Sequence, residues 1–323
     1  MMRQCGWAVA AGVIVLMLVG WAGPAMAGPQ MRVAYAAVSS IFAGVWLAHD
    51  LGYIERHGLK AQLIYISSGG TAAQALIGGD LEMSIGASNA VISAQLGGAP
   101  IIAIGSVNSK PAMSLYVRRE RTDIARVEDL RGKTLGITRF GSSTDFVSTL
   151  LFRKYGIERQ VKVLALGGVP EMHAGLQQGK IDAMITSPPV GPFARHVINL
   201  ADMGVAFSMD YMAVTRDYLR RSPDTVERFF KGYIEGIAAL RQRKEQAIRV
   251  IAKYLRSEER APEGYEYAVT YLARVPRVEP ETVYSVLDVL GKGRLPLEQF
   301  ADNTILDKIE REGFVARIYR EGR

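Results

Sequence analysis

Small hydroxyl, amide and glycine residues cluster in this chain where predicted strands end and predicted helices begin. The clusters are Ser39-Ser40, Gly69-Gly70-Thr71, Ser88-Asn89, Ser106 with Asn108, Gly141-Ser142-Ser143-Thr144, and Ser187. Helix N-termini carry unpaired N–H groups and a partial positive charge, which suit carboxylate, sulfonate or phosphate groups. Glycine lets a ligand approach the backbone. The pattern predicts non-covalent capture of a small molecule, although each cluster alone is also typical of plain helix capping.

The candidate ligand-binding residues come from these clusters. They are Ser39, Ser40, Gly70, Thr71, Ser88, Asn89, Asn108, Gly141, Ser142, Ser143, Thr144 and Ser187. Ligands of open α/β sheets bind at the carboxyl ends of the strands, and the clusters recur in both halves of the chain. We therefore expect one cleft that two lobes share. Arg139 is a candidate anion partner, but a lone arginine beside a strand end is more often a surface residue.

Residues that would support covalent, metal or phosphate chemistry are missing or scattered. The sequence has no G-x-S-x-G elbow, no phosphate loop ending in Gly-Lys-Ser/Thr and no H-E-x-x-H. The four histidines, His49, His57, His173 and His196, do not pair at ligand spacing, so we expect no metal. The carboxylates show no catalytic pairing along the chain, which leaves open a pair formed only in space. We predict no catalytic residue and no cofactor.

The first 27 residues have the features of a secretory signal peptide. Arg3 supplies a positive charge, Gly6 to Ala22 is an uncharged apolar stretch, and Ala25-Met26-Ala27 fits the small-x-small cleavage rule. We predict cleavage after Ala27 and a periplasmic location; the alternative is an uncleaved membrane anchor. Cys5 is the only cysteine, so the mature chain forms no disulfide. The net charge of +7 is scattered among acids, which predicts no nucleic-acid partner.

Strands alternate with helices of about ten residues along the mature chain, as in parallel α/β units. The expected strands are 32–36, 61–66, 83–85, 101–104, 134–138, 161–166 and 183–186. Residues 75–83 align with 175–183, each reading as a helix end, a glycine stop, an acidic turn and an apolar strand. This duplication predicts two similar lobes, with chance likeness as the alternative. After Pro223 apolar residues recur at helical spacing, which predicts a helical tail packed on the first lobe.

Residues 32–200 resemble the solute-binding proteins of the nitrate, sulfonate and taurine importer group, which share their fold with thiamine-pyrimidine synthase-like proteins. The segments that carry the resemblance are Leu51-Gly52-Tyr53-Ile54-Glu55-Arg56-His57-Gly58-Leu59, Gly78-Gly79-Asp80-Leu81-Glu82-Met83, Val127-Glu128-Asp129-Leu130-Arg131-Gly132-Lys133 and Gly179-Lys180-Ile181-Asp182-Ala183. The resemblance implies an α/β, two-lobed periplasmic-binding-protein-like (type II) fold with a helical C-terminal tail. Two interlobe crossings are expected near residues 107–116 and 206–214. The implied domains are the signal peptide (1–27), lobe I (28–110 plus 212–323) and lobe II (111–211).

The resemblance also implies an extracytoplasmic solute-binding component of an ABC importer. Lobe closure would trap a small anionic organic or oxyanion ligand, and the closed form would dock on a membrane permease. The expected partners are the small-molecule ligand and the cognate permease, and the expected state is a monomer. The alternatives are a thiamine-pyrimidine-synthase-like enzyme and a ligand-sensing module of the same fold. Ligand-specific residues vary within the group, so the identity of the ligand does not carry over.

Overall fold

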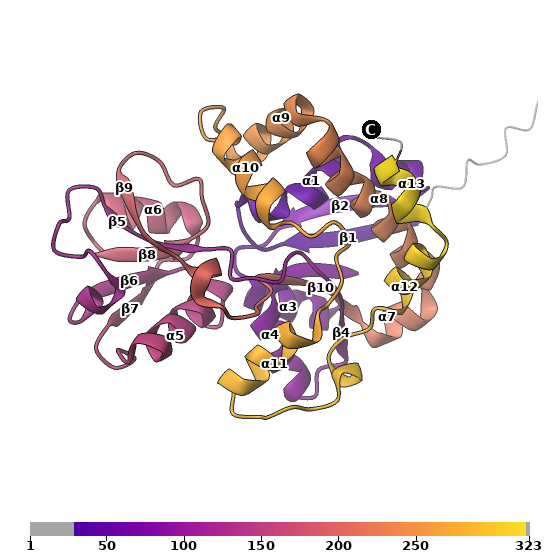
Figure 1. Ribbon diagram of the computed structural model, residues 1–323. Helices are drawn as coiled ribbons and strands as arrows, with labels where there is room; N and C mark the ends of the chain where they lie inside the picture. Colours follow the sequence, from indigo (N-terminus) through magenta and orange to yellow (C-terminus); the bar gives the residue numbers. More distant parts are fainter. Residues whose placement is uncertain (1–28, 321–323) are drawn as a thin grey trace, which may run out of the picture.

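The computed structural model describes residues 29–320, which form two α/β lobes joined side by side (Figure 1). The strands of lobe I come from residues 30–106 and 210–215, on either side of the lobe II strands at residues 114–199. The predicted signal peptide and the cleavage site after Ala27 lie outside the described residues. Within residues 29–320, no helix combines the length and the apolar character needed to cross a bilayer.

The sheet of lobe I has the strand order β2-β1-β3-β10-β4. Its strands are β1 (Gln30–Tyr35), β2 (Lys60–Tyr65), β3 (Met83–Ala87), β4 (Ile101–Ser106) and β10 (Asp210–Thr215). Strand β1 pairs in parallel with β2 and β3, whereas β10 runs antiparallel to β3 and β4. The helices between these strands are η1 (Ser40–Phe42), α1 (Ala43–Asp50), α2 (Tyr53–Arg56), α3 (Gly69–Gly78) and α4 (Ser88–Leu96).

The sheet of lobe II repeats this arrangement with the order β7-β6-β8-β5-β9. Its strands are β5 (Ser114–Arg118), β6 (Thr134–Ile137), β7 (Lys162–Ala165), β8 (Ala183–Thr186) and β9 (Ala194–Asn199). Its helices are η2 (Val127–Leu130), α5 (Ser143–Tyr155), α6 (Val169–Gln177) and η3 (Leu200–Met203). Helices α3 and α6 begin at residues 69 and 169, and strands β3 and β8 begin at residues 83 and 183. The offset of 100 in the sequence is therefore an offset between equivalent elements of two similar lobes.

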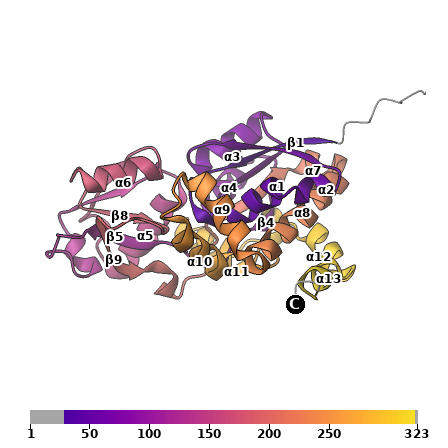
Figure 2. The same ribbon diagram turned by 90° about the horizontal axis from the view of Figure 1, so that it is seen from above.

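The C-terminal helices wrap lobe I and leave lobe II bare of any counterpart (Figures 1 and 2). They are α7 (Arg216–Arg221), α8 (Pro223–Gln242), α9 (Lys244–Leu255), α10 (Ala261–Tyr271), α11 (Pro280–Val289), η4 (Leu297–Gln299), α12 (Thr304–Arg311) and α13 (Phe314–Arg320). The aromatic residues Phe229, Phe230 and Tyr233 of α8 are fully buried, and α8 packs on α1 and α2, so the helical tail packs on lobe I as predicted. The helices approach closely because Gly236 has no side chain: a Cβ there would lie 2.6 Å from the carbonyl oxygen of Gly44.

Two short crossings, residues 107–113 and 204–209, connect the lobes. They are shorter than expected because residues 114–116 already belong to β5 and residues 210–214 to β10. The crossings run side by side: the amide of Met209 donates to Asn108 Oδ1 (2.8 Å), and the amide of Phe207 donates to Ser109 O (3.1 Å). The hydroxyl of Tyr267 on α10 donates to Ala112 O (2.7 Å). The helical tail therefore anchors the first crossing.

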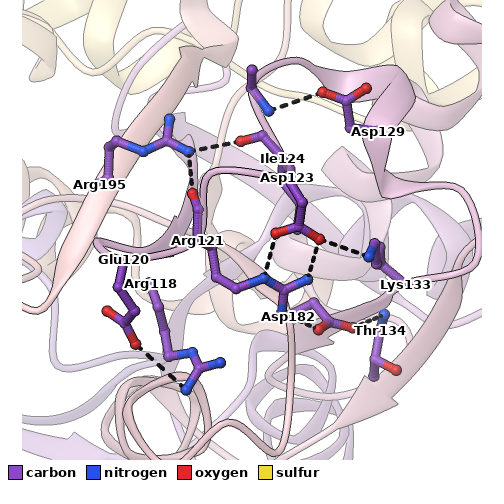
Figure 3. A network of polar contacts seen from close by, with 11 residues as sticks. Arg118, Glu120, Arg121, Asp123, Ile124, Asp129, Lys133, Thr134, Asp182 and Arg195 are labelled. Carbon is purple, nitrogen blue, oxygen red and sulfur yellow. Dashed lines mark hydrogen bonds and ion pairs between the residues drawn. The ribbon is translucent and has the colours of Figure 1, made fainter.

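Matching carboxylates hold equivalent strands, β1 in lobe I and β6 in lobe II. Glu82 Oε2 accepts a hydrogen bond from the amide of Arg32 in lobe I (2.6 Å), and Asp182 Oδ2 accepts from the amide of Thr134 in lobe II (2.8 Å). An arginine pairs with each acid: Arg32 pairs with Glu82, and Arg121 pairs with Asp182, as Figure 3 shows. Burial alone would raise the pKa of both carboxyls, but these hydrogen bonds outweigh it and lower both pKa values. The repeated acidic turn is therefore a structural brace.

Candidate functional site

A cavity of about 50 Å³ lies between the lobes, at the carboxyl ends of β1, β6 and β8. We call it the inner cavity. The start of η1 and the start of α3 form its lobe I wall, and the start of α5 with the end of β8 forms its lobe II wall. Both crossings contribute to its floor through Met113 and Met209. The site thus occupies the position at which open α/β sheets bind ligands.

Hydroxyl groups of lobe II line the inner cavity and also cap α5. Ser142 is the N-cap, and its Oγ accepts from the amide of Asp145 (3.3 Å). Thr144 Oγ1 lies 2.8 Å from Ser142 Oγ and accepts from the amide of Thr138 (2.9 Å). Ser143 Oγ donates to the carbonyl oxygen of Met209 in the second crossing (2.7 Å). The amides of a first helical turn have no acceptor within the helix. The lobe II wall therefore caps α5 and can also donate hydrogen bonds to an acceptor atom of a ligand.

The lobe I wall contains a backbone conformation that serine rarely adopts. Ser68, the N-cap of α3, has φ +82°, in the region that favours glycine. Gly69 follows, and a Cβ there would collide with the backbone nitrogen of Ala87 at the end of β3. The start of α3 therefore rests directly on β3 and holds Ser68 against the cavity. Ser68 was not among the predicted ligand-binding residues, although the Ser-Ser pair immediately before Gly69-Gly70 was an available signal.

Asp210, the first residue of β10, is the one residue with a charged side chain among those that line the inner cavity. It is 5% exposed. Its backbone oxygen accepts from Ser208 Oγ (2.9 Å) and from the amide of Val107 (3.1 Å), but within residues 29–320 no donor lies within hydrogen-bonding distance of its carboxylate. Burial raises the pKa of this carboxyl to about 7. Asp210 was not among the predicted ligand-binding residues, although an acid directly before the apolar run 211–214 was a visible signal.

Five of the twelve predicted residues line the inner cavity: Ser39, Ser142, Ser143, Thr144 and Ser187. Ser39 Oγ and Ser187 Oγ lie 2.7 Å apart, so this pair joins the two lobes directly. Gly141 has φ +80° and turns the chain into α5. The exposed side chain of Arg139 does not line the cavity either, although its carbonyl oxygen accepts from Ser142 Oγ (2.7 Å).

The other predicted residues lie around the inner cavity without lining it. Ser88 Oγ donates to Ser208 O (2.6 Å), and Asn89 Nδ2 donates across the lobes to Gly141 O (3.0 Å). Asn108 joins the two crossings, as described above. The remaining three are buried Ser40, half-buried Gly70 and exposed Thr71. The structure thus gives Ser88, Asn89 and Asn108 hydrogen bonds that hold the lobes and crossings in place.

A larger cavity of about 610 Å³, the outer groove, adjoins the inner cavity. The two share Ser39, Val169 and Ser187, so the hydroxyl pair Ser39–Ser187 stands between them. Three tyrosines of lobe I (Tyr35, Tyr65 and Tyr254) and three basic residues of α9 and the loop after it (Lys253, Arg256 and Arg260) line the groove. Burial lowers the pKa of His173 to about 4, so this groove residue is neutral at pH 7. The outer groove is aromatic and basic, unlike the inner cavity.

Few polar contacts cross between the lobes away from the crossings. Ser67 Oγ donates to Gly167 O (2.7 Å), and these residues occupy equivalent loops of the repeat. Asn199 Nδ2 donates to Tyr271 Oη (2.9 Å). In the described part of the chain no group of three His, Cys, Asp or Glu residues is arranged to hold a metal ion. The site offers hydrogen bonds from two bodies that a narrow hinge connects, which suits enclosure of a small molecule.

Two similar α/β lobes, two crossings and a polar cavity between them define a two-lobed binding-protein fold. The sequence pattern of the family described as NMT1/THI5 like matches residues 39–247, and the chain belongs to this family. A protein of Brucella abortus strain 2308 named as a binding protein is 24% identical over 219 residues. The match covers 65% of this chain and 66% of that relative, just under two thirds of its length. The family confirms the resemblance found in the sequence.

Solved structures show the same fold at low sequence identity. The alkanesulfonate-binding protein SsuA from Xanthomonas axonopodis pv. citri, bound to MOPS, superposes with a TM-score of 0.70 at 17% identity, over 86% of this chain and 96% of that one. The desulfurization enzyme DSZB superposes with a TM-score of 0.61 at 15% identity, over 88% of this chain and 99% of that one. The fold therefore occurs both in a binding protein and in an enzyme, and the site has to decide between them.

Proposed function

We propose that this protein is the exported solute-binding component of an ABC importer, which captures a small molecule in the inner cavity. The observation that carries the proposal is a hydroxyl-lined cavity between two lobes that only two short crossings connect. The relative named as a binding protein and the sulfonate-binding SsuA support it. The apolar segment and the Ala25-Met26-Ala27 motif support export to the periplasm.

The proposed mechanism is lobe closure about the crossings. Contacts such as Ser39–Ser187 and Ser67–Gly167 are single hydrogen bonds, each with a net stabilisation of about 0.5–1.5 kcal/mol. Each contact is weak by itself, and a ligand that touches both walls adds contacts to the closed form alone, so it shifts the population toward that form. A monomer whose closed form docks on a membrane permease completes the proposal. The expected division, residues 28–110 with 212–323 as lobe I and residues 111–211 as lobe II, stays as the proposed one except that residues 210 and 211 go to lobe I, because they begin β10 of its sheet.

An enzyme is the second candidate, because DSZB shares the fold and Asp210 has a pKa near the range of a general base. No Cys, His or Lys lines the inner cavity among the described residues. Non-covalent binding requires only the hydrogen-bonding groups that the cavity has. Covalent catalysis would require a serine or threonine as the nucleophile, with Asp210 as its one available base.

The test combines N-terminal sequencing, a thermal-shift screen and recovery of the ligand. Periplasmic protein should begin at Gly28, and one or more compounds among nitrate, alkyl sulfonates, aromatic carboxylates, amines and amidines should raise the melting temperature of purified protein. A ligand at about 100 times its Kd stabilises a fold by roughly 2.7 kcal/mol. The bound compound should be recovered chemically unchanged. Full-length protein retained in the cytoplasm, or conversion of the compound, would contradict the proposal.

A further inference from the structure

We propose that Asp210 recognises a ligand nitrogen, so the inner cavity takes a compound with an ammonium, amidinium or amino N–H group and not a simple oxyanion. The inference rests on the proposed function and names the ligand class of the same site. It departs from the anionic ligand that the sequence predicts. The observations behind it are the burial of Asp210, the lack of a donor for its carboxylate and the absence of a basic side chain in the cavity lining among residues 29–320.

Asp210 lies where the second crossing enters the sheet of lobe I. It begins β10 and pairs with Ala87, the last residue of β3, whose neighbour in the chain begins α4. The backbone oxygen of Asp210 is used by Ser208 and Val107, so the main chain is fixed while the carboxylate keeps its acceptor capacity. An ionised carboxylate only accepts hydrogen bonds. Burial of such a group without a partner is costly, and a ligand N–H removes that cost.

The charges around Asp210 favour a donor over an anion. The ionisable groups that interact electrostatically with it are the phenols of Tyr233 and Tyr267, and burial raises the pKa of both, so they stay neutral. Three basic residues line the adjoining outer groove instead of the inner cavity, and there Lys253 pairs with Asp50. An oxyanion in the inner cavity would therefore meet a carboxylate and no cation. A cationic or N–H-bearing group would meet a charge-assisted acceptor.

The helix N-termini in the cavity walls do not reverse this preference for a ligand nitrogen over an anion. The starts of α3 and α5 present partial positive charges, and they suit an acceptor atom elsewhere on the ligand. They lie on the two lobes, whereas Asp210 lies on the floor beside Met209. A ligand with a nitrogen toward Asp210 and an acceptor toward a helix start satisfies all three elements. A simple oxyanion satisfies only the helix starts.

The experiment uses pairs of compounds that share a shape and differ in charge. Acetamidinium matches acetate, and benzamidinium matches benzoate. Each is titrated calorimetrically into the full mature protein at pH 8 and at pH 5. At pH 8 we expect each amidinium to bind at least about tenfold more tightly than its carboxylate partner. At pH 5, below the pKa of Asp210, that preference should be lost because the carboxyl is protonated.

Two variants separate recognition from folding. Asp210→Asn keeps the shape and removes the charge, and it should weaken amidinium binding by about tenfold or more. Asp202→Asn removes the same charge from an exposed position of lobe II and should leave binding unchanged. Unfolding curves check that both variants fold.

Three results would overturn the inference: carboxylates that bind more tightly than amidinium ions, an unchanged amidinium affinity in Asp210→Asn, or no amidinium binding at all. Acetate itself should bind more tightly as the pH falls from 8 to 5, because protonation removes the Asp210 charge that repels it. The three overturning results are distinct from a failure of the proposed function. Carboxylate binding with the compound recovered unchanged would retain a solute-binding protein and remove only the ligand class.

Discussion

The two lobes share a scaffold but present different surfaces to the cleft. The two sheets have equivalent strand orders. In each lobe an acid holds the equivalent strand, β1 or β6, and the two acids are 100 residues apart. At the cleft, α3 begins with Gly69-Gly70 below a strained Ser68, whereas α6 begins with Val169-Pro170. The strand that enters each sheet from a crossing also differs, because β10 begins with Asp210 and β5 with Ser114. Duplication explains the framework, and the departures from it mark the site.

The departures also differ in energetic cost. A repeated brace such as Glu82 or Asp182 has its partners within the lobe, so it stabilises the fold. Asp210 has a buried carboxylate with no donor among the described residues, and Ser68 has a backbone angle that favours glycine. Backbone hydrogen bonds to Ala36 and Ala72 hold Ser68 in this conformation, whereas within residues 29–320 nothing offsets the cost of burying the Asp210 carboxylate. Such costs are concentrated at functional sites, where a ligand offsets them.

The largest expected effect on stability comes from removing the charge of Asp210, which has no counterpart at the start of β5 in lobe II. The folded pKa of Asp210 is about 7 against 3.8 in the unfolded chain. The folded state therefore holds the proton more tightly, and stability falls as the pH rises from about 4 to 7. Asp210→Asn removes this loss and should raise the free energy of unfolding at pH 8 by on the order of 4 kcal/mol, at 1.36 kcal/mol per pKa unit.

Urea unfolding of both proteins at pH 4 and pH 8 measures this difference, which should nearly vanish at pH 4. Ser114→Ala, at the equivalent strand start of lobe II, serves as the control and should show no such pH dependence. A variant that is less stable than the wild type at pH 8 would show that the Asp210 carboxylate is well solvated or paired.

The second prediction contrasts the two helix starts. Gly69→Ala places a Cβ against the backbone of Ala87 and should destabilise the fold by about 1–3 kcal/mol through overpacking. Val169 is half-buried at the equivalent position of α6, so Val169→Ala should lower the free energy of unfolding by less than Gly69→Ala does. Urea midpoints of the two variants compare the positions. Equal losses would mean that the close approach of α3 to β3 is not what distinguishes the lobes.

The third prediction concerns the shared brace. Glu82→Gln and Asp182→Asn should each lower the free energy of unfolding at pH 7 by about 1–2 kcal/mol, because each removes charge-assisted hydrogen bonds at a partly exposed site. Both folded pKa values are lowered, so this stabilisation is present above the unfolded pKa and is lost as the pH falls through the folded pKa. Thermal unfolding from pH 7 down to pH 3 should show the two losses shrink together; a loss in one lobe only would break the equivalence.

The smallest expected effect lies in the tail that only lobe I has. Arg256 follows α9 with φ +51°, a conformation that glycine adopts without strain. Arg256→Gly should therefore stabilise the fold by about 0.4–1 kcal/mol. Calorimetric unfolding detects such a change. A loss of stability would mean that the contacts of this side chain in the outer groove outweigh the backbone strain.

The sequence predicted most of the framework because strands and helices follow local patterns. The seven expected strands correspond to β1 to β4 and β6 to β8, with ends within two residues. The strands it omitted, β5, β9 and β10, enter their sheets by antiparallel pairing with distant segments. Strand β10 pairs with β3 across more than 120 residues. Periodicity in a single sequence does not reveal such pairing.

The same reason limits the prediction of the site. Ser39, Ser142 and Ser187 line the cavity because topology gathers the carboxyl ends of parallel strands. Asp210 enters through the pairing of β10, and that register cannot be read locally. Asn108 has the residue type of a ligand contact, but its amide is used between the crossings.

The central claim is that ligand enters the inner cavity when the lobes separate, and the pair Ser39–Ser187 offers the most direct test. The two hydroxyls already lie 2.7 Å apart across the cleft. In the double variant Ser39→Cys with Ser187→Cys, oxidation should lock the lobes together, and reduction should release them. The predicted mature chain has no other cysteine. The measurement is calorimetric titration of the strongest binder from the thermal-shift screen into oxidised and reduced protein. We expect binding to be abolished on oxidation and restored by reductant, whereas undiminished binding to the oxidised protein would contradict the account.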